Sequence, residues 1–172
     1  SASAEIALEF HPVLRSAVED RVLAAGTPAL DALDVTIADG SPAPWRPGST
    51  VVARGTLYGP LASAPIEAEI APHDAPIAWT ELVELDGPGA FTSSGGFAPS
   101  QPGHYTWVWM IEAHEQPDEH LLPDDYAWSD RYGLPAESFE VVQPLPSTGA
   151  DLTAAPWLIG IGVVLIGGGL TV

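Results

Sequence analysis

The sequence contains no cysteine, no lysine and no asparagine. Without cysteine the chain has no disulfide, thiolate nucleophile, zinc–thiolate site or internal thioester. Without lysine it cannot form Lys–Asn or Lys–Asp isopeptide cross-links, and without asparagine it has no N-glycosylation acceptor. A high-GC coding bias accounts for the missing lysine and asparagine, but the chemical exclusions hold whatever the cause. Any folded domain is therefore held together by its core and its hydrogen bonds.

Basic residues are scarce, and the charge is strongly unbalanced. The 172 residues include 23 Asp and Glu against five Arg, which gives a formal net charge of −18. Phosphate backbones and anionic lipid surfaces repel such a chain, so we expect no nucleic-acid partner and no electrostatic adhesion to lipid by the polar part. The hydrophobic content of 46% is too high for a disordered acidic tail. The length allows one ordinary domain with appendages.

Apolar and polar residues alternate with a period of two over residues 33–142, which is typical of β-strands. The heaviest apolar stripe is Tyr105, Trp107, Trp109 and Ile111. The other alternating runs lie at residues 33–37, 50–57, 66–70, 77–85 and 139–141. Glycine and proline separate the runs. The pattern predicts an all-β, Ig-like antiparallel β-sandwich at residues 27–143, with Trp79 buried beside Trp107 and Trp109.

The first 26 residues fit this pattern less clearly. Residues 9–13 loosely resemble residues 141–145, because in both segments a strand-like apolar run ends at a proline. We interpret residues 1–26 as the end of a preceding module and a linker, although a chance match explains the similarity equally well. Residues 13–25 hold the one pattern that could form a long helix. The lack of an initiator methionine and of a secretion signal leads us to expect that the sequence is a piece of a longer protein.

The segment Gly103-His104-Tyr105-Thr106-Trp107-Val108 resembles the tyrosine corner of Ig-like domains. In that motif the hydroxyl of a tyrosine at the start of a late strand donates a hydrogen bond to the backbone a few residues upstream. The resemblance implies such a hydrogen bond for Tyr105.

A second motif lies near the C-terminus. Leu145-Pro146-Ser147-Thr148-Gly149 precedes an uncharged apolar run over residues 152–172. The order of pentapeptide, short spacer and apolar segment resembles the cell-wall sorting signal of Gram-positive surface proteins. This resemblance implies a linker with the motif at residues 144–151 and a transmembrane helix at residues 152–172. As a helix, the apolar run would span about 30 Å, the thickness of a hydrocarbon core.

The resemblance implies a chemical role for each motif residue. Pro146 holds the peptide extended for a groove-shaped enzyme site. Thr148 supplies the carbonyl that a sortase cysteine attacks, and Gly149 leaves as the amine. The partners implied are a transient sortase, a peptidoglycan precursor bonded through Thr148, and the membrane before processing. The implied location is the cell wall of a secreted protein. Sorting signals end in a basic tail, which is missing after Val172, so we expect truncation here as well.

A longer series of segments resembles the repeated stalk modules of actinobacterial LPxTG surface proteins. The segments are Gly55-Thr56-Leu57-Tyr58-Gly59-Pro60, Gly87-Pro88-Gly89, residues 103–109, and Arg131-Tyr132-Gly133-Leu134-Pro135-Ala136-Glu137. This resemblance implies surface display or adhesion, with an external ligand that the sequence does not identify. Two alternatives remain open: an anchoring module of a larger extracellular enzyme, and a plain membrane-anchored surface protein.

The connection at residues 113–135 is long, and such loops are usually functional or mobile. Its His114-Glu115-Gln116-Pro117-Asp118-Glu119-His120 segment lacks the H-E-x-x-H spacing of a zinc helix, so we predict no zinc site. Four acids could gather around Ca²⁺, or three aromatic residues could anchor a partner or glycan. In a third interpretation the aromatics fold back onto the domain below an acidic rim. The acids are Asp118, Glu119, Asp124 and Asp125, and the aromatics are Tyr126, Trp128 and Tyr132.

Motifs for catalysis are missing from the sequence. It has no G-x-S-x-G elbow, no phosphate-cradling glycine loop and no cysteine nucleophile. Carboxylate pairs carry no weight in a chain this acidic. We therefore predict that the chain is not an enzyme and that it needs no cofactor.

Overall fold

The structure is a computed structural model that describes residues 9–144. The predicted sorting motif at residues 145–149 and the predicted membrane helix at residues 152–172 lie outside the described residues. Within residues 9–144 no helix has the length and hydrophobicity needed to cross a membrane.

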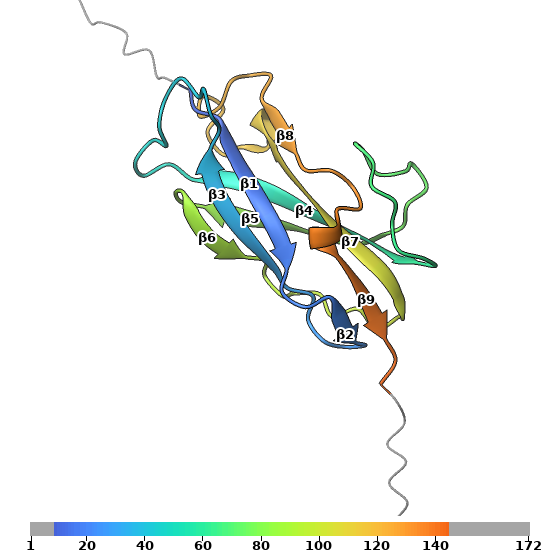
Figure 1. Ribbon diagram of the computed structural model, residues 1–172. Helices are drawn as coiled ribbons and strands as arrows, with labels where there is room; N and C mark the ends of the chain where they lie inside the picture. Colours follow the sequence, from blue (N-terminus) through green and yellow to red (C-terminus); the bar gives the residue numbers. More distant parts are fainter. Residues whose placement is uncertain (1–8, 145–172) are drawn as a thin grey trace, which may run out of the picture.

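The described chain is all-β, as the alternating pattern predicts (Figure 1). It contains nine strands, two short 3₁₀ helices and no α-helix between residues 9 and 144. The strands are β1 (Pro12–Val18), β2 (Val22–Ala24), β3 (Asp31–Ile37), β4 (Val51–Leu61), β5 (Ile77–Leu85), β6 (Gly89–Thr92), β7 (Gly103–Glu112), β8 (Ala127–Ser129) and β9 (Ser138–Val142). The 3₁₀ helices are η1 (Ala113–Glu115) and η2 (Pro135–Glu137).

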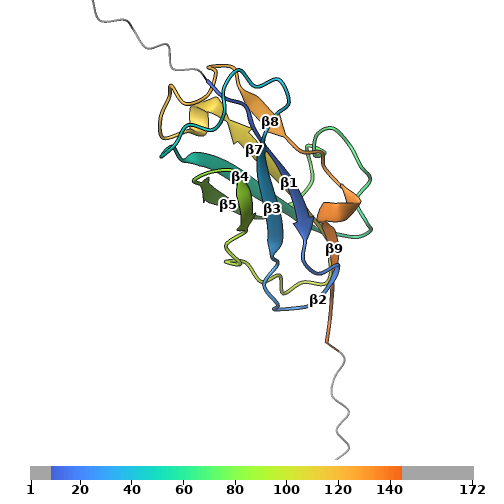
Figure 2. The same ribbon diagram turned by 60° about the vertical axis from the view of Figure 1, so that its left-hand side comes forward.

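The strands form two sheets. The smaller sheet has the order β1-β3-β6, and the larger has the order β2-β9-β7-β4-β5, with β8 pairing to β7. Every strand pair is antiparallel except the parallel pair β2–β9, so the larger sheet is mixed. Figures 1 and 2 show the smaller sheet lying over one face of the larger sheet. This two-layer arrangement is consistent with a β-sandwich.

The core lies between the two sheets. The stripe of Tyr105, Trp107, Trp109 and Ile111 is confirmed as its largest part, since each of these residues is at most 1% exposed. The rings of Trp107 and Trp109 stack with their centroids 5.5 Å apart. The smaller sheet contributes Leu14, Leu33 and Val35, and the larger sheet also contributes Val51, Ala53, Leu57, Leu85, Phe139 and Val141. Buried aromatic surface of this size supplies much of the stability of a domain without cross-links.

The hydrogen bond expected for Tyr105 is present. Its hydroxyl donates to the carbonyl oxygen of Gln101 at 2.9 Å, four residues upstream. Burial raises the pKa of Tyr105 above its usual value, so the hydroxyl keeps its proton. The bond ties the start of β7 to the preceding turn.

Two predictions from the alternating pattern are wrong. The run at residues 66–70 is a loop rather than a strand, and Ile66 and Ile70 are 86% and 81% exposed. Strand β4 is already paired on one side with β5 and on the other with β7, so no sheet edge is available beside it. Trp79 is also outside the core, with 36% of its surface exposed. It lies on the edge strand β5, where its ring stacks on Phe97 at 5.6 Å.

The N-terminal segment also differs from its interpretation. Residues 12–24 form β1 and β2, and they contain no helix. Strand β1 pairs along its whole length with β3, and β2 pairs with β9, so both belong to the same two sheets as the rest of the domain. Phe10 and Leu14 are buried in the common core. The start of the domain therefore lies before residue 27. The resemblance to the end of another module was misleading because short strand patterns look alike.

One close contact in the core gives a test of the packing. A Cβ added to Gly55 of β4 would lie 2.6 Å from the Trp109 ring, whereas one added to Gly87 would meet nothing within 4 Å. We expect Gly55→Ala to lower the free energy of unfolding by about 1–3 kcal/mol, because the ring must move out of its packed position. Urea unfolding followed by tryptophan fluorescence measures the change. Gly87→Ala is the matched control, and equal stability of the two variants would contradict the packing described here.

Candidate functional site

The four acids of the residue 113–135 connection lie on the surface. All four are exposed, and Asp118 makes an ion pair with Arg46 at 3.5 Å. No three of the carboxylates of Asp118, Glu119, Asp124 and Asp125 come within 4.8 Å of one another in the described structure. The fold therefore does not bring these acids together around one point.

The three aromatic residues of this connection pack against the domain. Tyr126 stacks on His11 with ring centroids 5.3 Å apart, and its hydroxyl donates to the carbonyl oxygen of Pro12. Burial raises the pKa of Tyr126 to about 12. Tyr132 is 4% exposed and meets Tyr58 edge to face at 5.5 Å. Trp128 lies on β8 and is partly buried against the core. This arrangement matches the third interpretation, in which the aromatics fold back below an acidic rim.

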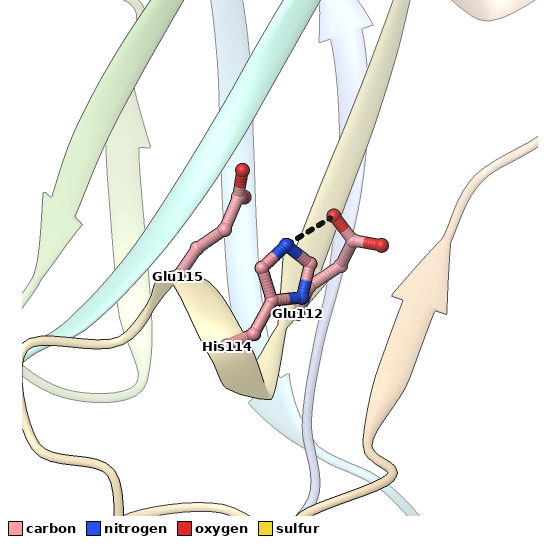
Figure 3. Close-up of side chains that lie close together, drawn as sticks. All are labelled: Glu112, His114 and Glu115. Carbon is pink, nitrogen blue, oxygen red and sulfur yellow. Dashed lines mark ion pairs between the residues drawn. The ribbon is translucent and has the colours of Figure 1, made fainter.

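A different group of metal-ligating residues stands at the end of β7. Ligand atoms of Glu112, His114 and Glu115 all lie within 4.8 Å of one another, and Figure 3 shows His114 between the two glutamates. The guanidinium of Arg54 already pairs with both acids, at 2.8 Å to Glu112 and 3.3 Å to Glu115. The His114 ring is exposed, and its Nε2 is 3.9 Å from Glu112. Since Arg54 bridges both acids, the group is an ion-pair network at the surface.

The most unusual site in the described structure is a cluster of acids inside the domain. We call it the acid cluster: Asp31, Asp130 and Glu137, together with the hydroxyl of Ser16. Asp31 begins β3 and is 0% exposed, and Glu137 ends η2 and is 2% exposed. Asp130 follows β8, and Ser16 lies on β1. The cluster therefore joins both sheets and the connection before β9.

Trp109 holds two of these carboxylates in position through hydrogen bonds. Its indole Nε1 donates to Oδ2 of Asp31 at 2.6 Å, and its backbone N–H donates to Oδ1 of Asp130 at 2.8 Å. Ser16 Oγ lies 3.5 Å from Oδ2 of Asp130. Two buried oxygens, Oδ1 of Asp31 and Oε2 of Glu137, have no hydrogen-bond partner in the described structure. An unpaired buried carboxylate oxygen is costly, because the group has lost its water.

Burial changes how the cluster titrates. Loss of solvent raises the pKa of Asp31 to about 7, and the nearby charge of Asp130 raises it further against the lowering effect of the Trp109 hydrogen bond. The pKa of Glu137 is raised first by burial and then by the charge of Asp130, with which it interacts directly. Burial raises the pKa of Asp130 as well. Two carboxyl groups this close cannot both ionise cheaply, so Glu137 keeps a proton at neutral pH.

None of the three acids is among the sequence-predicted site residues, although the sequence holds a signal for two of them. Asp31 has the same parity as the buried residues Leu33 and Val35 of β3. Glu137 has the same parity as Phe139 and Val141, which are buried on β9. An acid that extends an inward-facing stripe is an exception to the pattern, and such exceptions mark sites of special chemistry. Asp130 follows no such stripe, so only the fold reveals its position.

Comparisons with known proteins do not identify the chain. No family model matches the sequence, and no curated protein matches it. Similar solved structures include a β-glucosidase from Listeria innocua in complex with glucose, at 12% identity over 77% of this chain and 16% of that one, with a TM-score of 0.35. They also include a CARDB domain from Pyrococcus furiosus in complex with di-metal ions, at 14% identity over 83% and 100%, with a TM-score of 0.34. TM-scores this low carry no argument about the present chain.

The acid cluster predicts that stability depends on pH in an unusual direction. The pKa values of its acids are raised in the folded state, so the folded chain holds more protons than the unfolded chain above about pH 4. The stabilisation is complete below that pH. It is lost as pH rises through the pKa values that the acids have in the folded state, by up to about 1.4 kcal/mol per pH unit for each titrating group. In buffer with a chelator, we expect a higher Tm at pH 5 than at pH 8.

Glu137→Gln separates this effect from general repulsion in a chain of net charge −18. The amide mimics the protonated acid, so the variant should show a flatter dependence of Tm on pH. Glu140→Gln makes the same carboxyl-to-amide change at an exposed position three residues away and should keep the original slope. A Tm that rises from pH 5 to pH 8, or equal slopes in the two variants, would show that Glu137 is not held protonated.

Proposed function

We propose that the chain is a display module of a secreted protein that a sortase joins to peptidoglycan. Residues 145–149 with the apolar run that follows carry this proposal, because the motif directly precedes a segment of membrane length. In this proposal the domain is an Ig-like sandwich that serves as a stalk or adhesin module. The reaction at Thr148 belongs to the sortase, so the chain is a substrate rather than an enzyme.

The arrangement of the ends supports a role as a spacer. The described chain enters the domain at one end and leaves β9 at the opposite end (Figures 1 and 2). Modules connected in this way extend end to end, whereas modules with adjacent ends fold back on one another. A stalk needs the first arrangement, because its purpose is to hold the outermost module away from the wall.

The chemistry of attachment follows from the motif. The apolar run at residues 152–172 holds the precursor in the membrane while the sortase cysteine attacks the carbonyl carbon of Thr148. The bond from Thr148 to Gly149 breaks, and Gly149 leaves with a new free amine. The amine of a peptidoglycan precursor then attacks the thioester, which releases the sortase and leaves Thr148 joined to the wall.

A second candidate function is the anchoring module of a larger extracellular enzyme, and a third is a plain membrane anchor. Both use the same domain and the same apolar segment. The encoding gene distinguishes the first two: upstream repeats of the Tyr58-Gly59-Pro60 and Tyr105-Thr106-Trp107 pattern favour a stalk, and an upstream catalytic domain favours an enzyme. Substitution of Thr148 distinguishes wall attachment from a plain membrane anchor.

Substitution within the motif tests wall attachment. When the full-length protein is expressed in a sortase-bearing host, we expect Thr148→Ala to abolish covalent attachment to the wall. The variant should then be extracted by detergent, whereas the original protein should require a peptidoglycan hydrolase for release. Ser147→Ala changes the position that the motif leaves unspecified and is the matched control, which should stay attached. Wall attachment of the Thr148→Ala variant, or detergent release of the original protein, would reject the proposal.

A further inference from the structure

Strand β5 forms one edge of the larger sheet and has a strand partner on one side only. It pairs with β4, and no strand within residues 9–144 pairs with its other side. The segment at residues 93–97 touches β5 through side chains: Phe97 stacks on Trp79, and the backbone N–H of Ser94 donates to the Glu81 carboxylate. No backbone hydrogen bond joins that segment to β5 in the described structure. The N–H and C=O groups along this edge are therefore open to another strand.

Exposed apolar side chains accompany this open edge. Ile77 is 60% exposed, Leu82 is 64% exposed and Trp79 is 36% exposed. Trp79 and Leu82 have opposite parity along β5, so they lie on opposite faces of the sheet. An added strand can cover apolar side chains on both faces of an edge, because its own side chains alternate between the faces. A ligand that packs on one face of the sheet would leave the other uncovered.

A cleft at the start of β5 offers a place for an apolar side chain of such a strand. The cleft has a volume of about 400 Å³. Ile77 and Ala78 of β5 line it, and Pro60, Phe97 and Tyr105 add further apolar surface. Clefts lined by hydrophobic and aromatic side chains typically hold apolar groups of a ligand. The edge thus combines an open backbone, apolar residues on two faces and a cleft for an anchoring side chain.

The charge of the edge indicates which kind of strand can pair with it. Glu81 and Glu84 are the charged residues of β5, which contains no lysine or arginine. Arg54 on the neighbouring strand β4 already pairs with Glu112 and Glu115. A second copy of the chain would bring its own two glutamates to the same edge, and each copy carries a net charge of −18. Like charges on facing strands are destabilising, whereas a positively charged strand is attracted.

We propose that β5 binds an extended, positively charged segment of a partner protein, which adds a strand to the larger sheet. The backbone of the segment pairs with the open edge. Its apolar side chains cover Trp79 and Leu82, and one of them enters the cleft beside Ile77. Its lysine or arginine side chains lie opposite Glu81 and Glu84, so the charges select this partner over a second copy of the chain.

The proposal does not depend on wall attachment and is tested with the chain of residues 1–172 in solution. The probe is the fluorescein-labelled peptide Val-Lys-Val-Val-Lys-Thr-Val-Thr-Phe, which in antiparallel register places lysine opposite Glu84 and Glu81 and phenylalanine opposite Ile77. We expect fluorescence anisotropy to show saturable binding that added NaCl weakens. The same peptide with glutamate in place of both lysines should bind about tenfold more weakly. No binding of the first peptide, or equal binding of both, would overturn the proposal.

Methylation of the peptide backbone tests strand pairing directly. In an added strand, alternate residues direct their N–H groups toward the sheet, and the residues between them direct theirs to solvent. Of two peptides methylated on alternate sets of backbone nitrogens, one should therefore lose binding and the other should keep it. Equal binding of the two methylated peptides would show that the backbone does not pair with β5 and would overturn the proposal.

Two variants of the chain locate the site. We expect Leu82→Thr to weaken binding of the probe about tenfold, because it removes apolar surface that the added strand covers. Val22→Thr changes a residue of similar exposure, 59%, on β2 at the opposite edge of the same sheet, and should leave binding unchanged. Equal affinities of the two variants would place the peptide elsewhere and overturn the proposal. A dimer of the chain that Leu82→Thr dissociates, measured by analytical ultracentrifugation, would assign the edge to a second copy and overturn it as well.

Discussion

The position of Trp109 is the constraint on which the rest of the structure depends. Its ring packs against Gly55 on the neighbouring strand, and its indole nitrogen reaches across to Asp31 on the opposite sheet. Its backbone N–H holds Asp130, and its carbonyl accepts the Asp130 N–H at 3.1 Å. One residue therefore links both sheets and the connection before β9. In a chain without disulfides or isopeptide bonds, such a shared contact replaces a covalent cross-link.

This link has an electrostatic cost. Bringing Asp31 and Asp130 to the same tryptophan places a buried acid beside a half-buried one, and Glu137 adds a second buried acid. The hydrogen bonds from Trp109 offset part of the loss of water, but two carboxylate oxygens stay unpaired. The cluster is therefore satisfied only by a species from solution. A proton meets this need, which makes the stability of this domain depend on pH.

Sequence periodicity predicted the all-β class and the buried stripe on β7, because a strand with neighbours on both sides produces a regular pattern. It failed where the pattern depends on a partner that the sequence does not specify. The run at residues 66–70 forms only an isolated bridge, between Ala68 and Tyr132, and Trp79 lies on an edge strand. Asp31 and Glu137 each lie two residues before a buried strand position, and this spacing could have indicated that the two acids face inward. Their meeting with Asp130 could not be predicted, because it depends on the tertiary path of the residue 113–135 connection.

The place of the acid cluster matters for a module that is tethered at one end. Under the proposed function, force from the wall enters through β9 and passes to earlier residues through β1. These two strands belong to different sheets, so no ladder of backbone hydrogen bonds joins them directly. Ser16 on β1 and Glu137, which immediately precedes β9, meet in the cluster. Hydrogen bonds of the cluster therefore link the two strands that carry the load, and the strength of the stalk would then depend on the protonation of Glu137.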